Sequence, residues 1–518
     1  MSELATTARD DAEGTVVLVV GAGPTGLTLA CELARDGVPF RLIEAEHGAR
    51  TGSRGKGVQP RTLEVFEDLG VAERVIANGW MAIPMHSIAP DGRMTRGGAI
   101  PESLANRSDI PYAASLITPE WRVEEALRLR LVELGGTVEF GTTLVAFDQS
   151  DGGVTAEVVV DGVTEIVRAR WLVGCDGGHS VVRKQTGVAF VGETREDVRM
   201  TLADLPVSGL DRSAWLTWQH PEGMLSLCPL PSTDLFQYGA SLAPGEEGRL
   251  DLASMQETLE RRTGRTDIRL HEPEWSSVWR ANVRLADHYC HANVFLAGDA
   301  AHIHSPAGGQ GMNTGIQDAH NLAWKFAAVV NGGAQLELLN TYEAERRPIA
   351  AHVLELSNTR LKQTLETHAV PTRRDASTIQ LDVGYRGSAL TRDDRDDAAA
   401  LRAGDRAPDA TGLSTIDGQR RLFDLIGGGR FTLLAFGSAT TAEAHGTALR
   451  VLHVVDELTG SGDIADTQGH LAAAYGASDR TLVLIRPDGY VGLISDAGDP
   501  QTVMDYLTID LVARPTSA

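Results

Sequence analysis

The chain has 518 residues, of which 42% are hydrophobic and 23% charged, a globular composition long enough for two to four domains. Its 47 basic and 70 acidic residues give a formal net charge of -23, which argues against nucleic acid and anionic membrane surfaces as partners. No run approaches the roughly 20 apolar residues that cross a bilayer, and the polar N-terminus is unlike a secretory signal, so a cytoplasmic protein is expected.

A strand, a glycine-rich turn and a helix are the first elements that the sequence predicts. Residues 15–20 are a β-branched run typical of a buried strand, and residues 27–36 repeat apolar side chains at helical spacing before Gly37. A second strand is predicted over 39–44. The turn between the first strand and the helix reads GAGPTG, residues 21–26. Such a βαβ unit is the context that a dinucleotide-binding fingerprint requires.

The glycine-rich turn predicts a binding site for a pyrophosphate. Gly21 permits the tight turn, Gly23 leaves room for the anion against the backbone, and Gly26 lets helix and strand pack closely. Pro24 and Thr25 lie where the backbone amides of the helix N-terminus face the anion. We therefore expect the turn to bind a dinucleotide.

Glu44 ends the second predicted strand. A carboxylate at that point accepts hydrogen bonds from an adenosine ribose and favours a 2′-hydroxyl over a 2′-phosphate, which predicts FAD or NAD rather than NADP. Two later glycine-rich stretches, 174–183 and 298–311, also follow predicted buried strands, and their motifs distinguish FAD from NAD.

The rest of the chain predicts two further units. Residues 191–279 contain short strands with aromatic and turn residues, which indicates a mostly antiparallel sheet. Residues 370–409 lack apolar periodicity and are interpreted as a linker, and the pattern beyond them predicts a smaller α/β domain. The other predicted elements are a helix over 123–134, strands over 137–147, 154–160, 169–173 and 293–297, a long helix over 311–332, and strands over 431–436, 481–485 and 491–494.

Three motifs occur in an order and spacing that one family shares. They are GAGPTG with Glu44, CDGGHSVVRK at 175–184, and LAGDAAHIHSPAGGQGMNTGIQDAHNLAWKF at 296–326. Over residues 15–370 the chain resembles the class A flavoprotein aromatic hydroxylases, which are single-component FAD monooxygenases related to p-hydroxybenzoate hydroxylase. In layout it is most similar to hydroxylases of aromatic polyketides such as angucyclines and anthracyclines, which share YEAERRPIA at 342–350 and a thioredoxin-like third domain.

The resemblance implies an α/β fold with three parts. A Rossmann-like FAD-binding domain would carry an inserted, mostly antiparallel substrate-domain sheet and be followed by a C-terminal thioredoxin-like α/β domain. The expected boundaries are 15–79, 113–190 and 285–370 for the FAD-binding domain, 80–112 and 191–284 for the middle domain, 371–401 for the linker, and 402–511 for the third domain.

The four cysteines all precede the third domain and contain no Cys-x-x-Cys pair. A redox role of that domain through a cysteine pair is therefore excluded, which leaves a packing or oligomer-forming role. The spacing of the cysteines and histidines supports neither a disulfide framework nor a metal site. The cysteines are Cys31, Cys175, Cys228 and Cys290.

The resemblance also implies non-covalent FAD and assigns its contacts. Asp299 would accept a hydrogen bond from the ribityl chain, and the helix beginning near Gly311 would point its positive end at the flavin. Arg54, Pro306 and Gly309 are the expected catalytic positions, although Lys56 and Arg61 compete with Arg54 for the same alignment. The expected cofactor-binding residues are Gly21, Gly23, Pro24, Thr25, Gly26, Glu44, Arg54, Arg122, Asp176, Asp299, Pro306, Gly308, Gly309, Gly311, Met312 and Asn313.

Two features of the flavin site are specific to this chain. The family often has Pro-Gln before its Trp-Arg helix, whereas this chain has Pro119-Glu120, so a flavin contact by a Gln side chain is not expected. The loop around Arg54 is flanked by Gly52, Gly55 and Gly57, and its flexibility would let the flavin move between an exposed and a buried position.

The middle domain is expected to bind a bulky, planar aromatic substrate. The expected reaction is hydroxylation of a polyketide-type phenol with NADPH or NADH and O₂ through a flavin C4a-hydroperoxide. The alternatives are Baeyer–Villiger oxygenation of a polyketide ketone and a non-catalytic flavin-bound scaffold. The protein could also form a homo-oligomer. The expected substrate-lining residues are Trp80, Met85, Tyr112, Trp215, Trp218, Met224, Phe236 and Tyr238.

Overall fold

A parallel sheet forms the centre of the FAD-binding unit. In the computed structural model, its strands run in the order β20-β12-β1-β2-β8, and β19 joins the edge antiparallel to β20. Val20 pairs with Gly174, and Gly174 pairs with Leu296, so neighbouring strands end together. The strands are β1 (Val17–Val20), β2 (Phe40–Glu44), β8 (Val138–Phe140), β12 (Trp171–Gly174), β19 (Cys290–His291) and β20 (Val294–Leu296).

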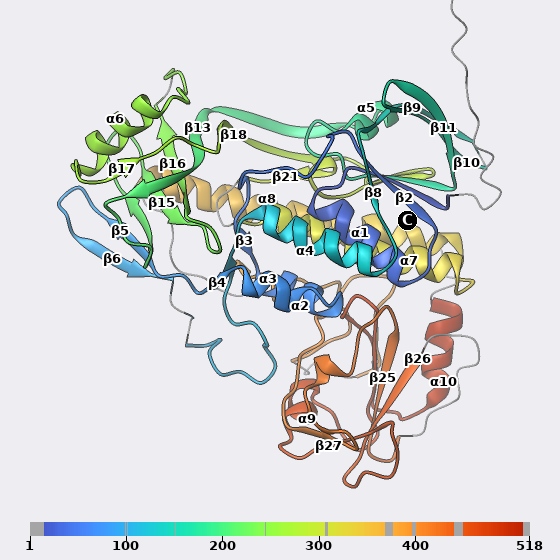
Figure 1. The fold of residues 1–518 in the computed structure, drawn as a ribbon. Coiled ribbons are helices and arrows are strands. Elements are labelled where there is room, and N and C mark those ends of the chain that lie inside the picture. The colour runs from blue at the N-terminus through green and yellow to red at the C-terminus, as the bar shows by residue number, and fades with distance from the viewer. Residues whose placement is uncertain are drawn as a thin grey trace, which may run out of the picture.

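Long helices pack on this sheet (Figure 1). Helix α1 contacts α7 on one side and α4 on the other, which places the helix after the glycine-rich turn in the middle of the layer. The helices of this unit are α1 (Pro24–Arg35), α2 (Pro60–Asp68), α3 (Ala72–Ala77), α4 (Glu120–Glu133), α5 (Val181–Thr186), α7 (Gly311–Val330) and α8 (Asn340–Thr367), with short turns η1 (Gly298–Ala300) and η2 (Leu336–Leu339).

Two small sheets complete the FAD-binding unit. One is the antiparallel meander β9 (Thr142–Ser150), β10 (Gly153–Val160) and β11 (Val163–Ala169). The other joins β3 (Gly57–Val58) and β4 (Trp80–Met81) through β7 (Leu116–Ile117). The second sheet fastens the segment after Arg54 to the start of the middle unit.

The middle unit is a mostly antiparallel sheet in the order β21-β18-β13-β16-β15-β14-β5-β6, with β17 paired to β13. Figure 1 shows β13 and β18 running from the FAD-binding unit into this sheet. Its elements are β5 (Met85–Ile88), β6 (Met94–Gly97), β13 (Phe190–Ser208), β14 (Trp215–Trp218), β15 (Leu225–Pro229), β16 (Leu235–Leu242), α6 (Leu252–Thr263), β17 (Arg269–Leu270), β18 (Trp275–Ala286) and β21 (His302–Ile303).

The C-terminal unit contains an eight-stranded mixed sheet in the order β22-β29-β28-β25-β26-β27-β23-β24. It packs below α2, α7 and α8 in Figure 1. Its elements are β22 (Arg392–Asp393), β23 (Leu413–Thr415), β24 (Gly418–Arg420), η3 (Leu422–Asp424), β25 (Phe431–Phe436), β26 (Leu449–Val454), β27 (Asp463–Asp466), α9 (His470–Tyr475), β28 (Leu482–Ile485), β29 (Val491–Ser495), α10 (Pro500–Asp505) and η4 (Tyr506–Asp510).

The segment interpreted as a linker contains a buried stretch at residues 378–380. Thr378, Ile379 and Gln380 are each at most 1% exposed, and the Thr378 carbonyl accepts a hydrogen bond from Gln310 just before α7. This connection is therefore a buried part of the junction between the two units. The structure describes residues 15–98, 100, 102–150, 152–243, 245–305, 309–367, 377–395, 400–439 and 449–510.

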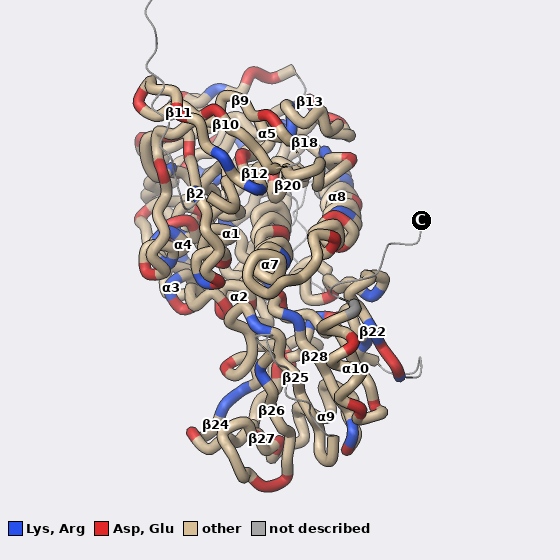
Figure 2. Tube along the Cα trace, turned by 90° about the vertical axis from the view of Figure 1, so that its right-hand side faces the viewer, with Lys and Arg blue, Asp and Glu red and all other residues tan. Residues whose placement is uncertain are grey.

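Charged residues of both signs are interspersed over all three units (Figure 2). Among the described helices, none combines the length and apolar composition needed to cross a membrane.

Candidate flavin site

Four loops meet at the carboxyl edge of the parallel sheet. Glu44 ends β2, Gly21 follows β1, Asp176 follows β12 and Asp299 follows β20. The first and third of the motifs found in the sequence thus lie on either side of the second. A Cβ atom added at Gly21 would lie 2.4 Å from the carbonyl oxygen of Cys175, so the first two motifs are in direct contact.

The glycine-rich turn has the geometry of an anion site. Gly21 has a φ of +102°, and a Cβ atom added at Gly26 would lie 1.9 Å from the Gly21 carbonyl oxygen, so both positions require glycine. Gly23 has no neighbour within 4 Å of its added Cβ position, which leaves the backbone open to a ligand. No side chain caps the first turn of α1, which begins at Pro24. The turn therefore fits a pyrophosphate.

Glu44 is held by the same turn. Its carboxylate accepts hydrogen bonds from the backbone amides of Ala22 at 2.8 Å and Glu46 at 3.1 Å. Arg50 Nη2 donates at 3.4 Å to Oε1, the oxygen that also accepts from Glu46. These contacts fix the carboxylate at the end of β2, where an adenosine ribose would lie.

Asp299 presents an open carboxylate at this edge. Asp299 is exposed, and none of the described residues donates a hydrogen bond to its carboxylate. A Cβ atom at Gly311 would lie 4.0 Å from Asp299 Oδ1, so the carboxylate stands beside the start of α7. An open acceptor in this position suits a ribityl hydroxyl.

The turn that carries Asp299 is fixed through its backbone. The amide of Gly298 donates to Asp318 Oδ2 at 3.1 Å, and Arg183 donates to the carbonyl of Ala300 at 2.7 Å. Thr25 lies so close that a Cβ atom at Gly298 would be 2.5 Å from its hydroxyl oxygen. The side chain of Thr25 therefore packs the first motif against the third.

Asp176 caps a helix in this structure. One carboxylate oxygen accepts from the amides of Val181 at 2.7 Å and Val182 at 3.1 Å, at the start of α5. The other oxygen, Oδ1, is buried without a partner among the described residues. Asp176 thus shapes the second motif, and its direct contact with FAD stays a prediction.

The loop before α7 is organised by two buried amides. Asn313 is fully buried and donates to the carbonyls of Gly57 and Gly309, both at 2.9 Å. Gln59, which the sequence did not single out, donates to the Gly309 carbonyl at 3.1 Å and is 1% exposed. Gly309 has a φ of +64°. The predicted flavin loop is therefore joined to the Arg54 loop.

The N-terminus of α7 is free for a partner of negative charge. No side chain caps it, and its first turn, which includes Gly311 and Met312, holds no acidic residue. The positive end of the helix dipole therefore faces the edge that carries Asp299. Pro306 and Gly308, expected at this loop, lie outside the described residues.

The Arg54 loop is fastened on both sides, contrary to the flexibility expected from its glycines. The amide of Gly55 donates to Glu120 Oε2 at 2.5 Å, and the amide of Glu120 donates to the Gly55 carbonyl at 3.1 Å. On the other side, Ser53 donates its amide to Asp204 at 2.6 Å and accepts from Gln237. Long-range contacts override the local freedom of glycine here.

The structure places Arg54, Lys56 and Arg61, the three candidates for the basic residue beside the flavin, in different environments. Arg61 is buried and bonded to Glu64 at 2.8 Å and to the carbonyl of Asp488 at 2.7 Å, so it faces the C-terminal unit. Lys56 donates to Gln237 of the middle sheet. Arg54 alone of the three is exposed.

Glu120 lies in the electrostatic field of the flavin site. Burial, together with the nearby Glu124, raises its pKa to about 7. Arg54 lowers this pKa and Asp299 raises it, so both charges lie near Glu120. Arg122 stacks on Trp121 with its guanidinium 4.1 Å from the ring centroid, and its contact with FAD stays a prediction.

Strand alternation divides the predicted substrate residues. Trp215 and Met85 are paired in register and point to the face that also holds Gln237 and Lys56. Trp80 packs in the same apolar cluster as Trp215. These three lie between the middle sheet and the Arg54 loop.

Other residues predicted to line the substrate site do not lie on that face. Trp218, Phe236 and Tyr238 pack on the opposite face in the core with α6, because each is one strand position away from a residue that faces the loop. Met224 precedes β15, and its carbonyl accepts from Arg262 of α6. Tyr112 packs against the main core, where burial raises its pKa to about 12.

One histidine and two carboxylates lie close together elsewhere in the described structure. The ligand atoms of Glu32, Asp68 and His320 lie within 4.8 Å of one another. Arg35 pairs with both carboxylates, with its Nη1 2.7 Å from Asp68 Oδ2. The guanidinium thus supplies the positive charge in this cluster.

Comparison with known families agrees with this arrangement. Residues 14–357 match the model of an FAD binding domain, and residues 400–511 match that of the aromatic-ring hydroxylase C-terminal domain. The chain belongs to the flavin-dependent aromatic-ring monooxygenases. FAD is therefore its cofactor, and the prediction of a class A flavoprotein hydroxylase fold is confirmed.

Relatives of this monooxygenase match over nearly their whole length. A flavin-dependent monooxygenase of Mycobacteroides abscessus is 41% identical over 95% of this chain and 99% of its own. The 6-methylpretetramide 4-monooxygenase of Streptomyces rimosus is 34% identical over 93% of this chain and 91% of its own. A solved structure of aklavinone-11 hydroxylase with FAD and aklavinone has a TM-score of 0.83 and 27% identity, and the match covers 98% of this chain and 100% of that one.

Proposed function

We propose that this monooxygenase hydroxylates a bulky, planar aromatic substrate of polyketide type, with NADPH or NADH as electron donor and O₂ as oxidant. The observation that carries the proposal is the face formed by Trp80, Met85 and Trp215, which lies against the loop that bears Arg54. Flat aromatic side chains suit a flat ring system. The named substrates of two relatives, 6-methylpretetramide and aklavinone, support this class.

Bound flavin supplies the transfer of electrons from the nicotinamide and the activation of oxygen. The chain orients it: the glycine turn and Glu44 would hold the adenosine and pyrophosphate half, and Asp299 the ribityl chain. The uncapped start of α7 would favour negative charge on a flavin ring bound beside it. Met85 and Trp215 exclude water from the face where the substrate ring would lie.

Lys56 is the basic side chain on that face. Its Nζ lies 4.3 Å from the Trp215 ring centroid and donates to Gln237. Burial lowers the pKa of Lys56, so a larger fraction of its amine is neutral and able to accept a proton at neutral pH. In the proposed reaction the phenolic proton of the substrate moves to Nζ, which leaves an electron-rich phenolate for attack.

A substrate panel tests the function. The purified protein would be assayed with tetracyclic phenols of the anthracyclinone and tetracycline types, and flavin reduction by NADPH and by NADH would be followed without oxygen. We expect a subset of substrates to stimulate reduction and to give products heavier by one oxygen. Both hydroxylation and Baeyer–Villiger insertion add one oxygen, so NMR of the product must show a new phenol rather than an ester.

Two outcomes would overturn the proposal. An ester or lactone product would establish oxygen insertion into a ketone. A flavin that is reduced equally slowly with every aromatic compound, and gives no product, would support a flavin-bound scaffold without turnover.

A further inference from the structure

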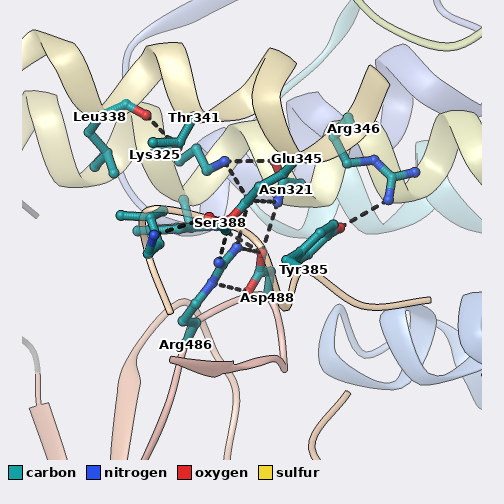
Figure 3. A network of polar contacts seen from close by, with 12 residues as sticks. Asn321, Lys325, Leu338, Thr341, Glu345, Arg346, Tyr385, Ser388, Arg486 and Asp488 are labelled. Carbon is teal, nitrogen blue, oxygen red and sulfur yellow. Dashed lines mark hydrogen bonds and ion pairs between the residues drawn. The ribbon is translucent and has the colours of Figure 1, made fainter. Parts of the chain in front are cut away.

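A buried polar network connects the C-terminal unit to the helices behind the flavin site (Figure 3). Arg486 and Asp488 come from the loop after β28, Glu345 from α8, and Lys325 and Asn321 from α7. The side chains of Arg486, Glu345 and Lys325 are fully buried. Burial of so many charges requires that each has its partner.

The network is balanced in charge. Arg486 donates to both oxygens of Glu345, at 2.6 and 2.9 Å, and also to Asp488 at 2.5 Å. Lys325 donates to Glu345 at 2.8 Å. Asn321 donates to Asp488 at 3.0 Å. Two cations thus face two carboxylates, and the C-terminal unit contributes one of each.

The next residue of α8 faces the flavin site. Arg346 follows Glu345 and donates to Asp318 Oδ1 at 2.7 Å and to the carbonyl of Thr314 at 3.1 Å. The other oxygen of Asp318 accepts from the amide of Gly298 at 3.1 Å. Arg346 therefore supports, through Asp318, the turn that presents Asp299.

Tyr385 links the two halves. Its hydroxyl oxygen accepts from Arg346 Nη1 at 2.9 Å. Its ring lies 5.2 Å from the Arg486 guanidinium and 4.4 Å from the ring of Tyr490 in the C-terminal unit. The contact series therefore runs from the C-terminal unit to Tyr385, Arg346, Asp318 and the flavin loop.

We propose that the docked C-terminal unit is part of the support of the flavin site, and that Arg486 and Tyr385 are positioning residues for the Asp299 turn. They act through Arg346 and Asp318, without contact with the flavin. Retention of FAD should therefore depend on a unit whose residues lie beyond the FAD-binding motifs.

A matched pair of substitutions tests the proposal. Tyr385→Phe removes the hydroxyl bonded to Arg346, and Tyr475→Phe removes another buried hydroxyl, which donates to the Pro408 carbonyl inside the C-terminal unit. The rate of FAD release from the holoenzyme is measured by the rise of flavin fluorescence. We expect release about tenfold faster for Tyr385→Phe and unchanged for Tyr475→Phe.

A second readout needs no flavin. In the FAD-free protein, hydrogen exchange of the backbone over residues 298–305 should rise for Tyr385→Phe and not for Tyr475→Phe. Equal effects of both substitutions on release and exchange would show a general loss of stability and would overturn the proposal.

Charge balance provides an independent check. Arg486→Met leaves two carboxylates facing Lys325 and should release FAD faster than Tyr385→Phe. Arg486→Met/Asp488→Asn restores the balance of one cation and one carboxylate and should slow release again. A folded Arg486→Met protein that releases FAD at the wild-type rate would overturn the proposal. If Arg486→Met fails to fold, the tyrosine pair decides.

Discussion

The titration of one carboxyl group, that of Glu120, should make the Arg54 loop sensitive to pH. Below pH 7 its carboxyl is largely protonated, since burial raises its pKa to about 7, and it then attracts Arg54 less and accepts less strongly from Gly55. Loosening of this loop is the predicted route by which the flavin moves, so substrate-stimulated flavin reduction should become faster as the pH falls from about 8 to about 6, by roughly threefold.

Glu120→Gln keeps an acceptor for the Gly55 amide but cannot ionise, so its reduction rate should be independent of pH over this range. Glu125→Gln, on the exposed side of the same helix, should keep the wild-type profile. The raised pKa also means that the folded state loses stability as the pH rises from 4.5 through 7, so Glu120→Gln should unfold at a higher temperature than wild type at pH 8. A wild-type profile in Glu120→Gln would assign the titration to another group.

Lys56 should act on the substrate and not on FAD. Lys56→Met retains an apolar stem over Trp215 but removes the amine that we propose as the base. We expect kcat to fall about tenfold at neutral pH while FAD content stays unchanged, and the difference from wild type should shrink at low pH, where the protonated Lys56 amine of the wild type cannot act as a base. Steady-state kinetics and flavin absorbance measure both. Lys362→Met, on the exposed surface of α8, is the control, and an equal loss there would contradict the role of Lys56.

At the scale of elements, the two faces of the middle sheet should respond differently to the same substitution. Trp218→Ala opens a cavity in the core beside α6 and should lower the free energy of unfolding by about 3–5 kcal/mol. The KM of the folded fraction for the aromatic substrate should change little.

Trp215→Ala removes a ring from the face toward the Arg54 loop, so KM should rise about tenfold with a smaller loss of stability. Thermal unfolding and steady-state kinetics of both variants check this. A higher KM in Trp218→Ala than in Trp215→Ala would reverse the assignment of the faces.

The elements around the flavin could be predicted because their signals are local. A buried β-branched run, a glycine turn and an amphipathic helix lie next to one another in the sequence, and the structure places them as β1, the turn and α1. The contacts that unite the site could not be predicted in this way. Asn313 bonds the carbonyl of Gly57, and Ser53 bonds Asp204, across long stretches of chain that no periodicity connects.

The face on which a strand residue lies also escaped prediction. The sequence of β16 alternates Phe236, Gln237 and Tyr238, and aromatic character alone suggested the two rings as pocket residues. The rings pack under α6, and the polar Gln237 faces the Arg54 loop. Which face of a sheet receives a helix is decided by the tertiary structure and not by the strand itself.

The net charge of the whole molecule should influence its reaction with the nicotinamide. A protein with a formal net charge of -23 repels anionic NADPH at long range, and salt screens this repulsion over about 10 Å at 0.1 M. The second-order rate of flavin reduction should therefore rise about twofold or more between low salt and 0.15 M salt. NADH carries less negative charge and should show a smaller increase in stopped-flow measurements. A rate that falls with salt would instead indicate a local positive site that attracts the nucleotide.

The buried connection between the units has a consequence for biosynthesis. Gln380 is buried against α7, where it accepts a hydrogen bond from Gln317, and the partners of Glu345 lie as far along the chain as Arg486. A ribosome therefore releases every FAD-binding motif long before the residues that neutralise the charges behind them. We expect the nascent chain to retain FAD firmly only after the C-terminal unit has emerged, so that cofactor loading would mark the docking of that unit.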